Sequence, residues 1–205
     1  MSQAAKHDTR SRASRELLYI SAGLALGLAG LASLTYALMP ERGDIGLPAI
    51  GGSFSMTAQD GRPIVSTDLL GRPYLVFFGY THCPDFCPTA LSDISAVFKE
   101  LGPDKKIAAL FVTVDPERDT PAVLKRYLEN FDSRILGLTG RPLQTEAMVK
   151  AFRVYAKKVP AGTPGDYTVE HTGAVYLMDK RGRFVRPFDL SRPPLEAARE
   201  LAAYL

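Results

Sequence analysis

The chain has 205 residues, 46% of them hydrophobic, and 25 lysines and arginines against 22 aspartates and glutamates give a formal net charge of +3. Four of the basic residues and two of the acidic ones lie in residues 1–16, so the rest of the chain is nearly neutral, at 21 against 20. No block rich in lysine and arginine follows residue 40, so the composition predicts no nucleic-acid partner.

Residues 1–16 form a polar, basic arm, and the next 23 residues, 17–39, contain no charge. A run of this length can cross a hydrocarbon core of about 30 Å. The apolar region of a secretory signal peptide has only about 7–15 residues before a small-x-small cleavage site, and Thr35-Tyr36-Ala37 is a poor site of that kind. We therefore expect a permanent transmembrane helix rather than a cleaved signal, with the basic arm on the cytoplasmic side.

Residues 40–50 are rich in glycine and proline and are interpreted as a linker. The remaining residues, 51–205, suffice for one domain with a single core. With the basic arm in the cytoplasm, this domain would face the periplasm, or the intermembrane space if the chain is mitochondrial. The protein would then be a single-pass protein of the inner membrane.

The domain begins with a predicted β-hairpin, whose turn falls at Asp60-Gly61. A strand at 74–79 follows, apolar at nearly every position, as in strands covered on both faces. The pattern then predicts, in chain order, a helix at 89–101, a strand at 107–114, a helix from 120, a strand at 135–138, a helix at 143–154, strands at 174–178 and 184–188, and a helix at 194–204.

This order predicts an α/β fold in which a parallel sheet with an antiparallel edge carries helices on both faces. A C-x-x-x-C after the first central strand, together with the β-β-α ending, is typical of a thioredoxin-like fold. Residues 157–168 contain Pro160, Gly162, Pro164 and Gly165 and have no apolar periodicity. We expect them to form a mobile loop that leads to His171.

The only two cysteines, Cys83 and Cys87, lie between the first central strand and the helix after it, where α/β folds usually place ligands. If Cys87 is in the first turn of that helix, the two Cβ atoms should be about 5–6 Å apart. A disulfide needs about 3.5–4.5 Å. The spacing favours two thiolates on one soft ion, although a structural disulfide remains an alternative. The free amides of the helix N-terminus are expected to favour thiolate over thiol.

Three segments resemble motifs of the SCO/SenC family of copper chaperones, which have a thioredoxin-like fold. They are Gly79-Tyr80-Thr81-His82-Cys83-Pro84-Asp85-Phe86-Cys87-Pro88, Val114-Asp115-Pro116-Glu117-Arg118-Asp119-Thr120-Pro121 and Val169-Glu170-His171-Thr172. The resemblance implies copper ligation by Cys83, Cys87 and His171, and delivery of copper to the copper-bearing subunit of cytochrome c oxidase during its assembly. Glu170 stands where the family often has aspartate, at a position not implied to be a ligand.

The residue types agree with this implication, because thiolates and imidazole suit copper(I). Zinc could use the same atoms, but a structural zinc site normally has four protein ligands. His171 precedes the strand at 174–178, and in a thioredoxin fold the loop before that strand lies beside the active-site turn. His82 is interpreted as a partly solvated turn residue that could assist Cys83.

The acidic segment after the second central strand has two possible roles. Asp119 and Thr120 can cap the next helix. Asp115 could instead orient the site or a partner, and the sequence favours the turn and capping roles.

The main alternative function is thiol-disulfide exchange catalysed by Cys83 and Cys87, possible because copper loading and exchange need the same reduced thiols. Thioredoxins, however, have C-x-x-C preceded by tryptophan and a cis-proline opposite it. This chain has no tryptophan, one extra spacer residue, and Thr172-Gly173 before the strand. A peroxidase is disfavoured because no arginine and threonine have the required spacing.

Overall fold

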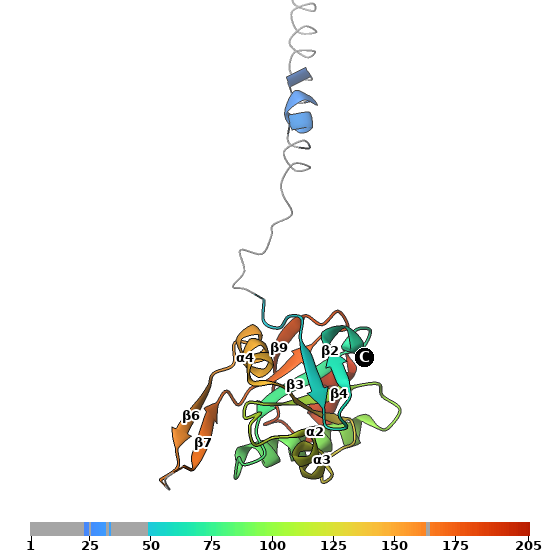
Figure 1. Cartoon of the computed structure of the whole chain (residues 1–205). Helices are drawn as coiled ribbons and strands as arrows, with labels where there is room; N and C mark the ends of the chain where they lie inside the picture. Colours follow the sequence, from blue (N-terminus) through green and yellow to red (C-terminus); the bar gives the residue numbers. More distant parts are fainter. Residues whose placement is uncertain (1–22, 25, 32, 34–48, 163–164) are drawn as a thin grey trace, which may run out of the picture. The chain divides into compact units, whose positions relative to one another are not determined.

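The structure, a computed structural model, describes residues 23, 24, 26–31, 33, 49–162 and 165–205 (Figure 1). The chain separates into two units between residues 47 and 48, and the second unit is Pro48–Leu205. Among the described residues, none of the helices has both the length and the apolar character that a membrane span requires. Most of the predicted anchor, residues 17–39, lies outside the described residues, so it stays a prediction.

A seven-stranded sheet in the order β2-β1-β5-β4-β3-β8-β9 forms the framework of the second unit. Its centre is parallel: β3 (Tyr74–Gly79), β4 (Ala108–Thr113) and β5 (Ile135–Thr139). One side ends in the antiparallel pair β8 (Val175–Met178) and β9 (Phe184–Phe188). The other side carries the hairpin β1 (Ser55–Ala58) and β2 (Pro63–Val65), which joins β5 in antiparallel fashion. The predicted mixed α/β fold and N-terminal hairpin are confirmed.

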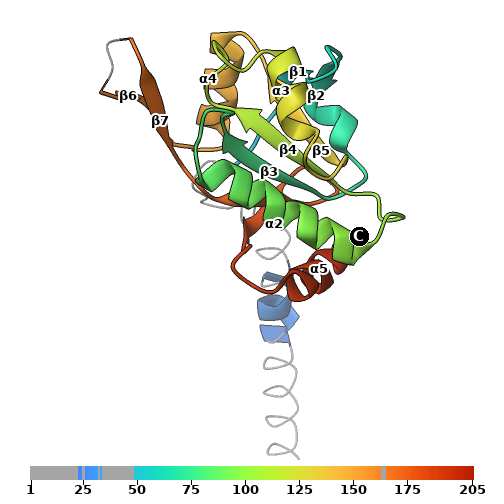
Figure 2. The ribbon, with the colours of Figure 1, turned by 90° about the horizontal axis from the view of Figure 1, so that it is seen from below.

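Both faces of the sheet are covered, which explains why β3 is buried at all six positions. On one face, Phe77 belongs to the core shared with α2 (Phe86–Leu101), α3 (Pro121–Leu128) and α5 (Pro194–Ala202). On the other, Phe78 packs with residues of α4 (Pro142–Ala151) and with Phe152. Figure 2 shows α2 and α5 lying across the same face of the sheet. Alternate side chains of one strand thus supply two cores.

The segment predicted as a mobile loop, residues 157–168, is instead most of a β-hairpin. Its strands are β6 (Ala156–Pro160) and β7 (Tyr167–His171), paired from Ala156 with His171 to Pro160 with Tyr167. Figures 1 and 2 both show this hairpin extending away from the seven-stranded sheet. Most of its side chains are exposed or half-buried, and β6 has no apolar alternation. The side chains of β7 do alternate about the buried Val169, a signal that the prediction of a loop overlooked. His171 therefore ends a strand.

Helix α2 begins at Phe86, three residues before the predicted start. Pro88 lies in its first turn, where the backbone N–H has no partner within the helix and a proline costs no hydrogen bond. A short 3₁₀ helix, η1 (Ser66–Leu69), follows β2. The early start puts Cys87 in the first turn of α2 and leaves Cys83 in the turn that precedes it.

The Gly79→Ala variant should be markedly less stable. A Cβ at Gly79 would lie 2.7 Å from the Sγ of Cys87 and 2.7 Å from a ring carbon of Phe111. Overpacking of this kind costs about 1–3 kcal/mol, which urea denaturation would measure. Gly140→Ala is the control, because its Cβ would meet no atom closer than 3.3 Å. Equal losses in the two variants would contradict this account.

Candidate metal centre

Cys83, Cys87 and His171 come together at the end of the sheet where β3 finishes. Their ligand atoms all lie within 4.8 Å of one another, and the Sγ of Cys87 is 3.5 Å from the Nε2 of His171. The three residues belong to separate elements: the turn after β3, the first turn of α2 and the end of β7. The set predicted from sequence is thus brought within reach of one ion.

Two hydrogen bonds from backbone N–H groups hold the turn that carries Cys83, one to a carbonyl and one to a sulfur. The N–H of Cys83 donates to the carbonyl of Tyr80 at 3.3 Å. The N–H of Cys87 donates to the Sγ of Cys83 at 3.4 Å. Asp85, the N-cap residue of α2, makes no side-chain cap, so the sulfur of Cys83 accepts from one of the otherwise free amides of the helix. Both cysteines are free thiols.

Burial raises the pKa of the Cys87 thiol well above its ordinary value of 9.0, and the adjacent Cys83 adds to the effect. The side chain is 0% exposed. The free-energy cost of removing a thiolate from water exceeds the stabilisation that hydrogen bonding to the backbone provides. The expectation that the helix N-terminus favours thiolate is therefore wrong for Cys87. In the metal-free protein this residue is a thiol at neutral pH.

His171 turns its unprotonated Nε2 toward the sulfur of Cys87. Its Nδ1 lies 3.1 Å from the carbonyl oxygen of Thr172, and because a carbonyl only accepts, Nδ1 must carry the proton. The other nitrogen, which faces Cys87, is then the one available to a metal. Burial lowers the pKa of His171 below 6.5, and the bond to Thr172 opposes this only in part. The imidazole is neutral at pH 7, as a ligand must be.

Aromatic rings surround the imidazole of His171. Those of Phe77, Tyr80 and Phe86 approach it edge-on, with centroids 6.4, 5.8 and 6.3 Å away. Phe86 is 51% exposed and covers Gly173, where an added Cβ would lie 2.6 Å from the ring. Tyr80, Cys83, Phe86 and His171 line a surface cleft at this point. The site thus has an apolar wall and a side that solvent can reach.

The structure gives different roles to the neighbouring residues that the sequence analysis named. His82 is exposed, with its Nδ1 3.2 Å from the hydroxyl of Thr81, and lies outside the cluster. Thr120 caps α3 by accepting from the N–H of Val123 at 3.3 Å, as predicted. The capping role predicted for Asp119 is wrong, because its carboxylate accepts from Thr81 and Thr113. Sequence gave no signal for that long-range contact.

Two thiols and one imidazole form a soft donor set. Such a set selects copper(I) or zinc over magnesium or calcium, which prefer oxygen ligands. A structural zinc would use a fourth protein ligand, and within the described residues the cluster contains three. The arrangement fits an ion held by three protein atoms beside an accessible cleft.

Comparison with known proteins identifies relatives over most of the chain. Residues 43–205 match the SCO1/SenC family model. The mouse protein described as SCO1 homolog, mitochondrial, is 37% identical over 164 residues, which are 78% of this chain and 58% of that protein. The chain thus spans less than two thirds of the length of that relative.

Solved structures resemble the second unit closely. ScoI from Bradyrhizobium japonicum, solved with copper bound, is 53% identical, with a TM-score of 0.74 over 77% of this chain and 100% of that one. BsSco, described as a member of the Sco family of cytochrome c oxidase assembly proteins with a disulfide switch, has a TM-score of 0.60 over 77% of this chain and 94% of its own. At 23% identity, BsSco shows only that the thioredoxin-like Sco fold is shared.

Alkylation of the reduced, metal-free protein should modify Cys83 before Cys87. Cys83 is partly exposed, whereas Cys87 is buried and its raised pKa leaves little of the reactive thiolate. The rate at Cys87 should therefore still be rising above pH 9.0, the ordinary pKa of a thiol. Mass spectrometry after short exposure to iodoacetamide measures both rates, with Cys83→Ser and Cys87→Ser variants to assign them. Faster reaction at Cys87 would contradict the described burial.

Proposed function

The chain belongs to the SCO1/SenC family, and on that premise we propose that it is a copper metallochaperone with Cys83, Cys87 and His171 as ligands. It delivers copper to the copper-bearing subunit of cytochrome c oxidase during assembly of that enzyme. The observation that carries the proposal is the convergence of two thiols and one imidazole within 4.8 Å. The copper-bound state of the 53% identical ScoI supports the choice of metal.

Copper(I) binding in this account requires the loss of protons from the cysteines, since thiolate rather than thiol is the metal ligand. The raised pKa of Cys87 makes this loss unfavourable in the metal-free state, so the positive ion has to stabilise the thiolate. His171 needs no such change, because its Nε2 is already unprotonated. Affinity therefore falls with falling pH through competition between protons and copper.

Release follows from how the ligands are distributed. The cysteines lie on the turn between β3 and α2, whereas His171 lies on the hairpin β6–β7. An incoming ligand of the oxidase subunit, reaching the cleft beside Cys83, replaces His171 first and then takes the ion from the thiolates. Each intermediate keeps the ion bound, so copper is not released into solution.

Thiol-disulfide exchange with an exported partner is the second candidate function. The observation in its favour is that Cys83 is a partly exposed free thiol whose sulfur lies within 4.8 Å of that of Cys87. In that role Cys83 attacks and Cys87 resolves the mixed disulfide. Thr172-Gly173, where thioredoxins have proline, weighs against exchange as the main activity.

The proposal includes a membrane location. Residues 1–16 would be a cytoplasmic arm, 17–39 a single transmembrane helix, 40–50 a linker and 51–205 the copper-binding domain. The support is the charge-free run and the basic arm before it. The domain would face the periplasm or, if the chain is mitochondrial, the intermembrane space. The mouse relative is described as mitochondrial.

His171→Ala should lower the copper(I) affinity of the reduced domain by more than about 100-fold, the upper end of what loss of an outer-shell partner costs. The thiols should still exchange with a model disulfide, and affinity should no longer depend on imidazole protonation. Competition with a chromogenic copper(I) chelator at several pH values gives both results. Cys83→Ser and Cys87→Ser should abolish binding and exchange together.

His82→Ala is the matched control for this experiment, because His82 is exposed and lies outside the three-residue cluster. It should bind copper(I) as the unchanged domain does. Unchanged affinity in His171→Ala would overturn the three-ligand site, and a loss confined to His82→Ala would move the ligand role to that residue.

The full-length protein should remain in the membrane fraction after an alkaline wash, because the charge-free run of residues 17–39 is long enough to span the bilayer. A reporter fused after Leu205 should be active only outside the cytoplasm. A chain starting at residue 49 is the control and should be released. Complete release of the full-length chain by the wash would contradict the anchor.

A further inference from the structure

Residues 115–119, here called the 115–119 loop, lie between β4 and α3 in the chain and contact both halves of the metal site. The cysteine half is the turn that carries Cys83, and the histidine half is the hairpin that carries His171. The carboxylates of Asp115 and Asp119 are both 0% exposed. A buried carboxylate is costly unless its oxygens are hydrogen-bonded. The partners of these two groups therefore show what the loop holds in place.

Asp119 holds the cysteine half. One carboxylate oxygen accepts from the hydroxyl of Thr81 at 2.6 Å. The other accepts from the N–H of Thr81 at 3.1 Å and from the hydroxyl of Thr113, the last residue of β4, at 2.6 Å. Because Thr81 is two residues before Cys83, this carboxylate fixes the start of the cysteine turn against the end of β4.

Asp115 and Arg118 hold the histidine half. The hydroxyl of Tyr167 donates to Asp115 at 2.8 Å, and Asp115 also forms an ion pair with Arg118. Arg118 in turn donates to the carbonyl of Tyr167 at 3.0 Å, and its guanidinium lies 3.8 Å from the centroid of the tyrosine ring. Tyr167 begins β7, the strand that His171 ends.

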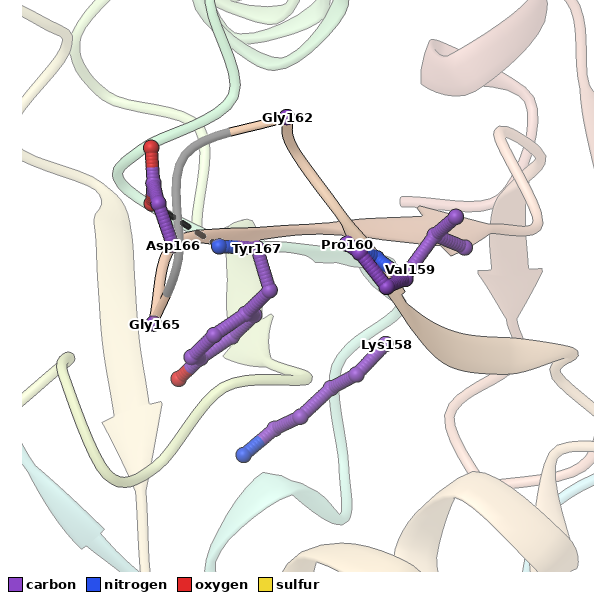
Figure 3. A pocket seen from close by; sticks show the side chains of 7 residues that line it. All are labelled: Lys158, Val159, Pro160, Gly162, Gly165, Asp166 and Tyr167. Carbon is purple, nitrogen blue, oxygen red and sulfur yellow. Dashed lines mark hydrogen bonds between the residues drawn. The ribbon is translucent and has the colours of Figure 1, made fainter.

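A second cation, that of Lys158, also approaches the Tyr167 ring. The Nζ of Lys158 lies 4.5 Å from the ring centroid, and Figure 3 shows both side chains extending to the same side of the hairpin. Lys158 also forms an exposed ion pair with Glu117 of the same loop, at 2.7 Å. The first residue of β7 is thus bound to the 115–119 loop on several sides.

We propose that the 115–119 loop is a clamp that positions the two halves of the metal site relative to each other. Asp119 sets the cysteine turn, and Asp115 with Arg118 sets the hairpin that carries His171. The inference rests on the proposed three-ligand site for its connection to copper. It assigns positioning roles to Asp115, Arg118, Asp119 and Tyr167, none of which is in the cluster of ligands.

The hairpin depends on this clamp because its other anchors are few, the main apolar one being Val169, which is buried in the core that contains Phe78. The hairpin is a two-stranded sheet whose side chains are mostly exposed or half-buried, and such a pair is marginally stable alone. Its other polar anchor is the hydroxyl of Tyr80, which lies 2.7 Å from that of Thr168 and accepts from the N–H of Val169 at 3.2 Å. Loss of one anchor should therefore loosen His171 without unfolding the sheet.

Tyr167→Phe tests the histidine half, because it removes the hydroxyl and keeps the ring beneath Arg118. In the metal-free protein, hydrogen exchange should become faster for the amides of β6 and β7, while the alkylation rate of Cys83 stays unchanged. Copper(I) affinity should fall about tenfold, near the low end of what a hydrogen bond to a charged group contributes.

Thr81→Val tests the cysteine half, because it removes the hydroxyl held by Asp119 and keeps the shape of the side chain. It should change the alkylation rate of Cys83 and leave hydrogen exchange in β6 and β7 unchanged. Tyr155→Phe is the matched control. The Tyr155 hydroxyl also donates to a carboxylate, Glu170, but at 3.4 Å on a side chain that is 54% exposed, and its loss should alter none of these measurements.

A merely structural network gives a different result: Tyr167→Phe and Thr81→Val would both alter hairpin exchange and cysteine alkylation, in proportion to lost global stability. That outcome, or equal effects of Tyr167→Phe and Tyr155→Phe, would overturn the clamp. The exchange and alkylation measurements need no copper. The clamp is therefore judged on them separately from the copper affinity of His171→Ala, which judges the three-ligand site.

Discussion

The antiparallel pairing of β3 with β8 determines where the metal centre can form. Cys87 and His171 are 84 residues apart in sequence, yet the pairing of Phe77 with Val175 places the end of β3 beside the start of β8. The cysteine turn follows β3, and His171 precedes β8 by four residues. The cysteine turn and His171 therefore lie at the same end of the sheet. The strand pairing alone brings the ligands close together, and local contacts then set their exact positions.

Within that framework, burial keeps Cys87 and His171 uncharged in the metal-free protein. The thiol of Cys87 has a raised pKa and the imidazole of His171 a lowered one, and burial is the first cause of both shifts. A thiolate or an imidazolium enclosed by Phe77, Tyr80 and Phe86 would be costly without a counter-charge. A soft cation supplies that counter-charge, which links occupancy of the site to the ionisation of its ligands.

The sequence predicted those parts of the structure that rest on local patterns. The apolar run at 74–79 identified the central strand. The resemblance to the SCO/SenC motifs, with which the residue types agree, identified the three members of the cluster. The hairpin β6–β7 was missed because β6 has no apolar alternation and the alternating run of β7 is only five residues long, and the start of α2 was placed three residues too late. Asp119 was misassigned because a capping aspartate and one that bonds to Thr81, 38 residues earlier, have the same local sequence.

The projection of the hairpin beyond the sheet gives it a mechanical property. Each strand has five residues, which at roughly 3.3 Å per residue amounts to about 16 Å from root to tip. His171 sits at the root, and Pro160 and Tyr167 pair near the far end. Because the 115–119 loop holds the hairpin at Tyr167, near its far end, the loop acts on His171 through a long lever arm, and a small displacement at Tyr167 becomes a still smaller one at His171. A weak force applied far from the sulfur atoms would then exert a large torque on the histidine.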